Sequence, residues 1–354
     1  MYKPETIIWI FTAKCNLNCP HCYTSRFLRS KELSLKEKLR LIDEMGELGI
    51  EHVGLSGGEP LIHPELSMIL RRLYDYDISI SLVTNACIAP SSIVELLATY
   101  DVYVYVSIDG PKNIHDSVRG LGTFEKVLRN VEKLRKYGID FGTVMAISKI
   151  NYKYVKEYLE LALKLGATYP SLIPVMPSGK AMSNGIYIES DEYVKAIETA
   201  VKFIEQVGYP ISLWCTPFAP LVSNSRYIYS SFCRTLDITD IDPSGNILAC
   251  DIIDYIVTNI RDRSLAKALE DYINNEVIKE ITEPPKLPEP CLKCPLKTFC
   301  RSGCFARAFS IYGDFNAGDP LCPKIHRYRQ SINNLIKRRI SNKVLPHNHV
   351  ASYM

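Results

Sequence analysis

The sequence lacks an apolar stretch long enough to cross a membrane. A membrane-spanning helix needs about 20 consecutive apolar residues, whereas the N-terminal run Ile7–Phe11 has only the length of a strand. Lys3 is the only basic residue before this run, and no small-residue cleavage site follows it, unlike in a secretory signal. We therefore expect a cytoplasmic protein that makes no contact with a membrane.

A large excess of charge is also missing. The chain has 42 Lys and Arg residues against 39 Asp and Glu residues, which gives a formal net charge of +3. Because so mild an excess does not argue for a nucleic-acid-binding surface, we expect no nucleic-acid partner. Glutamine is nearly absent, at Gln206 and Gln330 only, which is typical of heat-adapted proteins.

Cysteine, in contrast, is abundant, with twelve residues in a chain of 354. A disulfide framework suits a small secreted domain, so in this long chain we interpret the cysteines as reduced, metal-binding thiols. Cys15, Cys19 and Cys22 lie within eight residues. One loop with this spacing can bind a metal centre through soft sulfur ligands and leave one metal position open. Zinc is the alternative metal. A structural zinc ion takes four protein ligands, whereas this loop offers three thiols and no obvious fourth ligand lies nearby. His21 is interpreted as a loop residue and not as that fourth ligand.

Strand-length apolar stretches alternate with helical patterns from about residue 6 to residue 174. Ser34 and Glu37 form a predicted capping box at the start of one helix. Six βα units in series predict an α/β fold with a parallel sheet, open or curled into a barrel. The expected strands are Thr6–Thr12, Val53–Ser56, Ile78–Thr84, Val102–Ile108, Phe141–Ile147 and Tyr169–Pro174.

Polar motifs follow the first four strands. The cysteine loop comes after the first, Gly57-Gly58-Glu59 after the second, Asn85 after the third and Asp109 after the fourth. Because parallel strands end at the same edge of a sheet, we expect these motifs to meet at one rim. Each has an alternative interpretation: the glycines form a plain turn, and Asn85 and Asp109 cap the helices that follow them.

The motif Cys15-x3-Cys19-x2-Cys22, followed by Gly57-Gly58-Glu59, resembles the radical SAM superfamily. This resemblance implies a partial (β/α)6 barrel of the TIM type. It also implies a [4Fe–4S] cluster whose open iron binds the amino and carboxylate groups of S-adenosylmethionine. A low-potential electron, from a ferredoxin- or flavodoxin-type donor, then cleaves this molecule to a 5′-deoxyadenosyl radical that abstracts hydrogen from the substrate.

The same resemblance implies roles for individual residues. Gly57, Gly58 and Glu59 would bind the methionine amino group, and Tyr23 would lie near the adenine. The run from Val106 through Gly120 is similar to the signature of one subgroup, in which Ser107 and Arg119 hold the carboxylate of S-adenosylmethionine. A guanidinium group suits bidentate binding of a carboxylate, although a surface ion pair is the alternative for Arg119.

The βα pattern stops near Pro174. Asp191–Val207 is predicted to form one more helix, and the proline-rich stretch Glu283–Pro290 an extended connector. The C-terminal stretch Lys324–Lys343 is basic, and its apolar residues recur at helical spacing, so we expect an amphipathic helix packed on the barrel. Its basic face is solvated or contacts an acidic peptide or redox partner. The last residues, Leu345–Met354, are expected to fray.

Seven cysteines of the second half have a spacing that resembles the SPASM extension of radical SAM enzymes, which carries auxiliary iron–sulfur clusters. In that extension, Cys291, Cys294, Cys300 and Cys322 would bind a distal cluster, and Cys233, Cys250 and Cys304 a proximal one. Cys215 is a candidate fourth ligand of the proximal cluster, with a buried structural thiol or an open iron site as alternatives. In isolation, the run from Cys291 to Cys304 is also compatible with a zinc ribbon. Cys87 matches no motif and is interpreted as a small buried hydrophobe.

Asp251 directly follows Cys250 and is a candidate general base. Sulfatase-maturing members of the family place a proton-accepting Asp after the matching cysteine, and a carboxylate beside a cluster suits that task. The alternative is that Asp251 only accepts a backbone hydrogen bond in a turn.

These patterns together predict three regions. Residues 1–208 form the radical SAM barrel, residues 209–325 a small cysteine-rich α+β SPASM domain, and residues 326–354 the basic helix and tail. The expected activity is oxidation of a peptide or protein side chain, because auxiliary clusters suit net two-electron oxidation by accepting electrons. The alternatives are modification of a tetrapyrrole, pterin or other cofactor precursor and, in another class, a non-catalytic zinc- or cluster-binding protein.

Overall fold

Strand β1 (Thr6–Thr12) lies inside the central sheet and carries the cysteine loop at its end. It pairs in parallel with β2 (His52–Gly57) on one side and with β9 (Ile238–Ile241) on the other. Trp9 and Phe11 are fully buried beneath the helices, where they join the main hydrophobic core. The computed structural model describes residues 2–343, and it describes side chains as far as residue 334.

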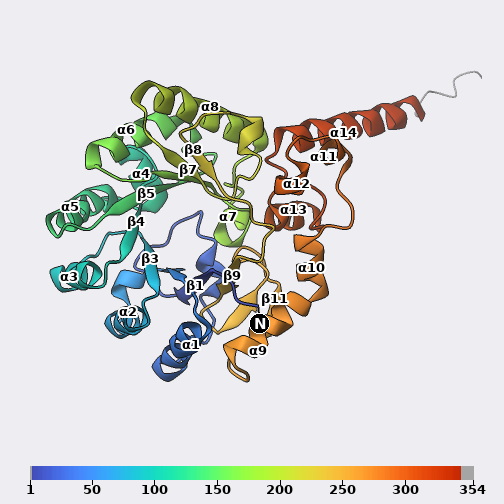
Figure 1. Cartoon of the computed structure of the whole chain (residues 1–354). Coiled ribbons are helices and arrows are strands. Elements are labelled where there is room, and N and C mark those ends of the chain that lie inside the picture. The colour runs from blue at the N-terminus through green and yellow to red at the C-terminus, as the bar shows by residue number, and fades with distance from the viewer. Residues whose placement is uncertain (1, 344–354) are drawn as a thin grey trace, which may run out of the picture.

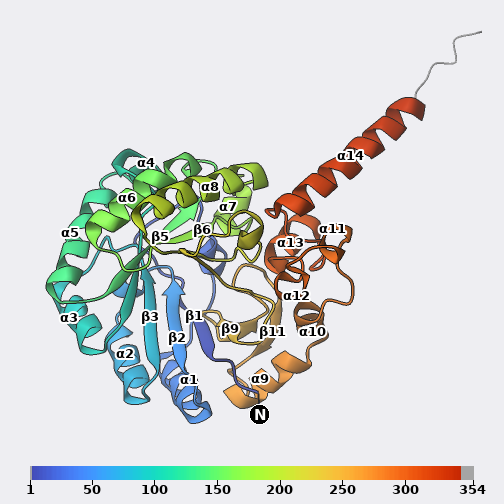
Figure 2. The same ribbon diagram turned by 45° about the horizontal axis from the view of Figure 1, so that its top comes forward.

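The sheet has eleven strands in the order β11-β10-β9-β1-β2-β3-β4-β5-β6-β7-β8. All neighbours pair in parallel except β9 with β10 and β10 with β11. No pairing joins β8 to β11 within residues 2–343, so the curved sheet is a partial barrel (Figure 2). The remaining strands are β3 (Ser79–Thr84), β4 (Tyr103–Ser107), β5 (Phe141–Ile147), β6 (Ser171–Pro174), β7 (Ile211–Leu213), β8 (Ile228–Ser230), β10 (Asn246–Leu248) and β11 (Ile256–Asn259).

Helices cover the outer face of the parallel strands (Figure 1). The predicted capping box is present, because Ser34 Oγ accepts from the Glu37 amide while the Glu37 carboxylate accepts from the Ser34 amide. The first eight helices are α1 (Leu35–Leu48), α2 (Leu66–Asp75), α3 (Ser91–Thr99), α4 (Lys112–Arg119), α5 (Thr123–Lys136), α6 (Val155–Leu165), α7 (Gly179–Ser183) and α8 (Ser190–Val207). None of the helices described is both long and apolar enough to cross a membrane.

All six predicted strands are present, and the bounds of β1 and β5 match the prediction. The sheet continues beyond six strands on both sides, which the sequence did not indicate. The added strands have only three or four residues each, too few to show an alternating pattern. The predicted helix at 191–207 is α8, which begins one residue earlier.

The second half of the chain ends in short helices around the remaining cysteines. The predicted connector is irregular only as far as Pro288, because α11 begins at Glu289. These helices are α9 (Leu265–Asn274), α10 (Glu276–Thr282), α11 (Glu289–Leu292), α12 (Lys297–Cys300), α13 (Phe305–Tyr312) and α14 (Pro323–Lys343).

The C-terminal helix was predicted correctly, but its packing was not. α14 contacts α8 and α11 near its start and then projects away from the body of the protein (Figures 1 and 2). Ile325 is 1% exposed, whereas Tyr328 is 36% exposed. Among the side chains described, which end at residue 334, α14 packs mainly through Ile325 near its start. The stretch Leu345–Met354, expected to fray, lies outside the described residues.

Candidate functional site

The thiols of Cys15, Cys19 and Cys22 lie together at the C-terminal edge of the parallel strands. Burial raises the pKa of the Cys19 thiol to about 11, and the neighbouring thiols of Cys15 and Cys22 act in the same direction. The loop is held from two sides, because Asn85 Nδ2 donates to Asn16 Oδ1 at 2.9 Å and the Lys180 amide donates to the Cys22 carbonyl at 3.1 Å. A bound cation would favour the thiolate form of Cys19, which burial alone disfavours.

Gly57 and Gly58 form the contact between the end of β2 and the base of this loop. A Cβ atom on Gly57 would lie 2.2 Å from the Thr12 carbonyl oxygen, and one on Gly58 would lie 2.1 Å from the Lys14 carbonyl oxygen. The amides of Gly58 and Glu59 donate to these two carbonyls at 2.8 Å. The glycine pair is therefore required by close backbone contact and is more than a plain turn.

Glu59 is completely buried and joins the ends of β2 and β3. Its carboxylate accepts from Thr84 Oγ1 at 2.6 Å, from the Asn85 amide at 2.7 Å and from the Leu61 amide at 3.0 Å. Burial raises the pKa of Glu59 to about 7. Because these donors already occupy the carboxylate, Glu59 contributes by positioning Asn85 beside Cys15, and direct binding of an ammonium group remains a prediction.

Arg119 forms a buried ion pair with Asp109 and not a surface one. Arg119 Nε donates to Asp109 Oδ2 at 2.6 Å, and the two side chains are 10% and 0% exposed. Asp109 also accepts from the Ala146 amide at 2.9 Å, so it anchors Arg119 between strand ends instead of capping the next helix. Within the described chain only Nε of Arg119 makes a hydrogen bond, which leaves its terminal nitrogens available near Cys19.

His21 and Ser107 complete this rim. Burial lowers the pKa of His21 to about 4, so the imidazole is neutral, and its Nε2 lies 4.0 Å from Asp109 Oδ2. Ser107 ends β4 and is 6% exposed. Cys87 is buried, as expected, and burial raises the pKa of its thiol to about 11.

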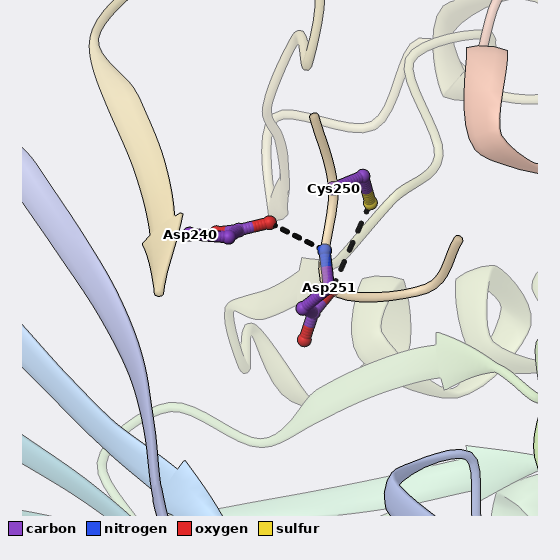
Figure 3. A group of neighbouring side chains, drawn as sticks. All are labelled: Asp240, Cys250 and Asp251. Carbon is purple, nitrogen blue, oxygen red and sulfur yellow. Dashed lines mark hydrogen bonds between the residues drawn. The ribbon is translucent and has the colours of Figure 1, made fainter. Parts of the chain in front are cut away.

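Tyr23 links the cysteine loop to the second half of the chain. Its hydroxyl donates to Asp251 Oδ2 at 2.8 Å, and the Asp251 amide donates to Asp240 Oδ2 at 2.7 Å. Cys250 Sγ lies 3.7 Å from Asp251 Oδ1 (Figure 3). Asp251 thus does more than accept a hydrogen bond in a turn. The sequence had identified Tyr23 and Asp251 separately, whereas Asp240 was missed and its only signal was a carboxylate within a strand-like stretch.

The other predicted cysteines lie in two groups, and all twelve cysteines are free thiols. In the first group the neighbouring Cys233 thiol is the main cause that raises the pKa of Cys215, and Cys304 lies close enough to Cys215 and to Cys250 for their charges to act on one another. Cys215 therefore lies with the proximal set, and its backbone has a left-handed φ of 52°. In the second group, the four residues predicted for the distal cluster line one small pocket: Cys291, Cys294, Cys300 and Cys322.

A buried ion pair that the sequence did not reveal holds the backbone of two proximal cysteines, Cys215 and Cys304. Arg307 donates through Nε and Nη2 to Asp319 at 3.0 and 2.7 Å, and through Nη2 to the Cys215 carbonyl at 2.5 Å. Asp319 in turn accepts from the Cys304 amide at 3.0 Å. The only sequence signal was an arginine within the apolar run of α13.

Together, eleven cysteines of the chain form three groups of three, four and four thiols, a set of donors that fits iron–sulfur clusters.

The chain is similar to known proteins over most of its length. Residues 9–162 match the model of the radical SAM superfamily. An AdoMet-dependent heme synthase of Methanosarcina barkeri is 29% identical over 340 residues, which cover 90% of this chain and 96% of the relative. The mycofactocin maturase MftC of Mycobacterium tuberculosis is 27% identical over 337 residues, covering 91% and 84% of the two chains.

Solved structures show the same fold over nearly the whole chain. Streptococcus suis SuiB bound to its precursor peptide SuiA has a TM-score of 0.74 at 16% identity, covering 90% of this chain and 76% of SuiB. The likeness therefore includes the partial barrel and most of the cysteine-rich region that follows it.

The Asp109–Arg119 pair provides a test of this site. Asp109→Asn leaves the buried guanidinium without a charged partner and should reduce the free energy of unfolding by about 3–5 kcal/mol. Glu125→Gln is the matched control, because it breaks the exposed Lys112–Glu125 pair and should have almost no effect. Thermal denaturation of the two variants measures the difference, and equal losses would contradict a buried, structural role.

Proposed function

We propose that this chain is a radical SAM enzyme and that it uses the radical derived from S-adenosylmethionine to oxidise a side chain of a peptide or protein. The observation that carries the proposal is the grouping of eleven of the twelve thiols into sets of three, four and four, with the set of three at the rim of the barrel. When bound, a [4Fe–4S] cluster at Cys15, Cys19 and Cys22 supplies the electron for reductive cleavage of S-adenosylmethionine.

The rim residues would bind the rest of S-adenosylmethionine. Arg119, held at one edge by Asp109, is positioned to clamp the carboxylate with its terminal nitrogens, and Ser107 lies at the end of the neighbouring strand. Gly57 and Gly58 bring backbone close to the cysteine loop for the amino group, with Glu59 fixing the local geometry. Tyr23 would border the adenine with its ring while its hydroxyl holds Asp251.

The two further cysteine groups would hold auxiliary clusters that accept the electron released when the substrate radical is oxidised. Cys215, Cys233, Cys250 and Cys304 form the proximal set, and the pocket lined by Cys291, Cys294, Cys300 and Cys322 the distal one. Asp251, between Tyr23 and Cys250, would accept the proton lost in the same step.

A second substrate class has a specific observation in its favour. The relative with 29% identity is named as a heme synthase, and it matches this chain over almost all of its own length. A tetrapyrrole precursor is therefore the second candidate. The peptide is proposed first because the mycofactocin maturase is nearly as similar and SuiB, with the same fold, was solved with a precursor peptide.

Removing the first set of thiols tests the radical chemistry. The anaerobically purified protein should contain about twelve irons, the sum for three [4Fe–4S] clusters, and should release 5′-deoxyadenosine from S-adenosylmethionine with dithionite. Joint replacement of Cys15, Cys19 and Cys22 by Ala should abolish the release and remove about four irons. A colourless, zinc-loaded protein, or cleavage that persists in the variant, would contradict the proposal.

Cys215 provides a separate test of the proximal set. Cys215→Ser should weaken iron binding there, because an alcohol is a poorer ligand for iron than a thiolate, and should change the EPR spectrum of the reduced protein. Cys87→Ser is the control, since this buried thiol lies in neither auxiliary group. Equal iron content and identical spectra in both variants would show that Cys215 is only a structural thiol.

Mass spectrometry can distinguish the two substrate classes. The reduced enzyme should convert a precursor peptide encoded beside its gene to a product lighter by two hydrogens, and should leave a tetrapyrrole precursor unchanged. Asp251→Ala should still cleave S-adenosylmethionine but slow this conversion at least tenfold. Conversion of the tetrapyrrole alone would establish the second candidate, and full peptide conversion by Asp251→Ala would exclude its role as the base.

A further inference from the structure

A cavity lies at the end of the barrel opposite to the cysteine loop. It has a volume of about 460 Å³ and extends along the starts of β2, β3 and β4. Because these strands are parallel to β1, their starts form the edge of the sheet away from the rim, the lower edge in Figure 2. A cavity of this size is within the range of small-molecule sites, about 300–1,000 Å³. None of the residues considered above for S-adenosylmethionine or for the cysteine groups lines it.

Tyrosine rings form much of the cavity wall. Tyr103 and Tyr105 extend from β4 in an edge-to-face pair, with ring centroids 4.9 Å apart. Gly142 on β5 leaves room for them, because a Cβ atom there would lie 3.0 Å from the Tyr103 hydroxyl and 3.1 Å from Tyr105 Cδ1. Tyr74 and Tyr100, from the ends of α2 and α3, form a second pair with centroids 5.4 Å apart. The face of a tyrosine ring carries partial negative charge and attracts cations.

The charged side chains that line the cavity are acidic. Asp77 and Asp101 directly precede the β3 and β4 segments, are exposed, and form no ion pair within residues 2–334. Burial lowers the pKa of His52, which also lines the cavity, so its imidazole adds no positive charge at neutral pH. Helices α2 and α3 end beside the cavity, and the C-terminal end of a helix is the negative pole of its dipole. The electrostatic environment therefore favours a cation.

The basic residues around this end of the barrel do not line the cavity. Four of them are paired with acidic residues: Arg71 with Asp75, Arg72 with Asp43, Lys3 with Glu51 and Lys136 with Glu132. Arg135, at the end of α5, is exposed and forms no ion pair in the described chain. Burial raises the pKa of the Tyr103 hydroxyl to about 12, and the nearby carboxylate of Asp140 acts in the same direction. Asp140 thus adds negative charge on the side of β5.

We propose that this cavity binds a small organic cation, with its ammonium or guanidinium group held between the tyrosine rings and the carboxylates of Asp77 and Asp101. Aromatic rings with nearby carboxylates suit a weakly hydrated organic cation. A hard metal ion is less well suited, because it takes six or more oxygen ligands and the lining offers two carboxylates from separate loops. A free amine and a basic side chain of a peptide present the same chemistry. The inference goes beyond the proposed function, since it involves neither S-adenosylmethionine nor a metal centre.

Calorimetric titration of the anaerobically purified protein tests the site with two cations and a neutral analogue. N-acetyl-arginine methylamide represents a basic side chain of a peptide, and spermidine represents a free amine. At least one of them should bind with a Kd below about 1 mM, and the tighter of the two identifies the source of the charge. N-acetyl-citrulline methylamide has nearly the shape of the arginine probe without its charge and should bind about tenfold more weakly.

Tryptophan fluorescence shows whether the cation binds in this cavity. The chain has two tryptophans, and Trp9 is fully buried in the core. The Trp214 ring centroid lies 4.9 Å from that of Tyr105, which lines the cavity. Binding should therefore change the fluorescence, and Trp214→Phe should remove the change while the calorimetric signal remains. A fluorescence change that persists in Trp214→Phe would contradict the location.

Substitutions of the lining separate charge from aromatic contact. Asp77→Asn/Asp101→Asn should weaken binding about tenfold, and Tyr74→Leu, at a half-exposed ring, about threefold. Asparagine tolerates the left-handed backbone of both aspartates, with φ of 55° and 49°, so the fold should be retained. The matched control is Asp262→Asn/Glu198→Gln, which makes the same change of charge at exposed residues without ion pairs in the described chain. It should bind like the unaltered protein.

Three outcomes would overturn the proposal: no binding of either cation, equal binding of the citrulline analogue, or equal weakening by the two double variants. If circular dichroism shows that Asp77→Asn/Asp101→Asn is unfolded, Tyr74→Leu and the citrulline analogue decide by the same titration. Failure of the proposed function is recognised separately, as the absence of 5′-deoxyadenosine with dithionite in the unaltered protein, because the titration requires no cleavage of S-adenosylmethionine.

Discussion

The arrangement of the site depends on one backbone contact, between Gly57-Gly58 and the residues that lead into the cysteine loop. No side chain fits between these segments, so the ends of β1 and β2 approach each other more closely than any other residues would allow. The contact places the Glu59 carboxylate under the rim, from where it fixes Asn85, and Asn85 holds Asn16 inside the loop. The positions of the three thiols in the cysteine loop thus depend on the lack of side chains at Gly57 and Gly58.

Buried positive charge accompanies each of the three thiol groups. Arg119, anchored by Asp109, lies near the cysteine loop. Arg307, anchored by Asp319, lies near the proximal cysteines. Each arginine is held by one carboxylate. Arg307 also donates to the Cys215 carbonyl, whereas the terminal nitrogens of Arg119 have no hydrogen-bond partner in the described chain. A buried guanidinium favours the anionic form of nearby thiols and would do the same for a cluster bound to them. The distal group lies beside buried Arg234, whose charge acts on Cys291 and Cys300, and it also has exposed positive charge in Lys293, Lys297 and Lys324.

Local patterns in the sequence account for most of the fold. The six βα strands and the capping box of Ser34 were predictable because each depends on residues close in sequence. The grouping of the cysteines was predictable only through resemblance to a family, since spacing alone allowed a zinc ribbon.

The Tyr23–Asp251 hydrogen bond joins residues 228 positions apart and has no local signal. Cys215 lies beside Cys233 with its backbone in the left-handed conformation, which residues other than glycine rarely adopt. Its position could therefore not be predicted from residue preferences. The contacts of α14 with α8 and α11 join segments far apart in the sequence and have no local signal.

The unpaired edges of the sheet have a mechanical consequence. Within residues 2–343, the two halves of the barrel wall are joined by backbone hydrogen bonds everywhere except between β8 and β11. A closed barrel can widen only by breaking a whole ladder of such bonds, whereas this one can widen along the open seam at the expense of side-chain contacts alone. Both seam strands are short, at three and four residues, which limits their ability to pair with another chain. The wall is therefore continuous through β1, which carries the cysteine loop, and can widen at the seam between β8 and β11.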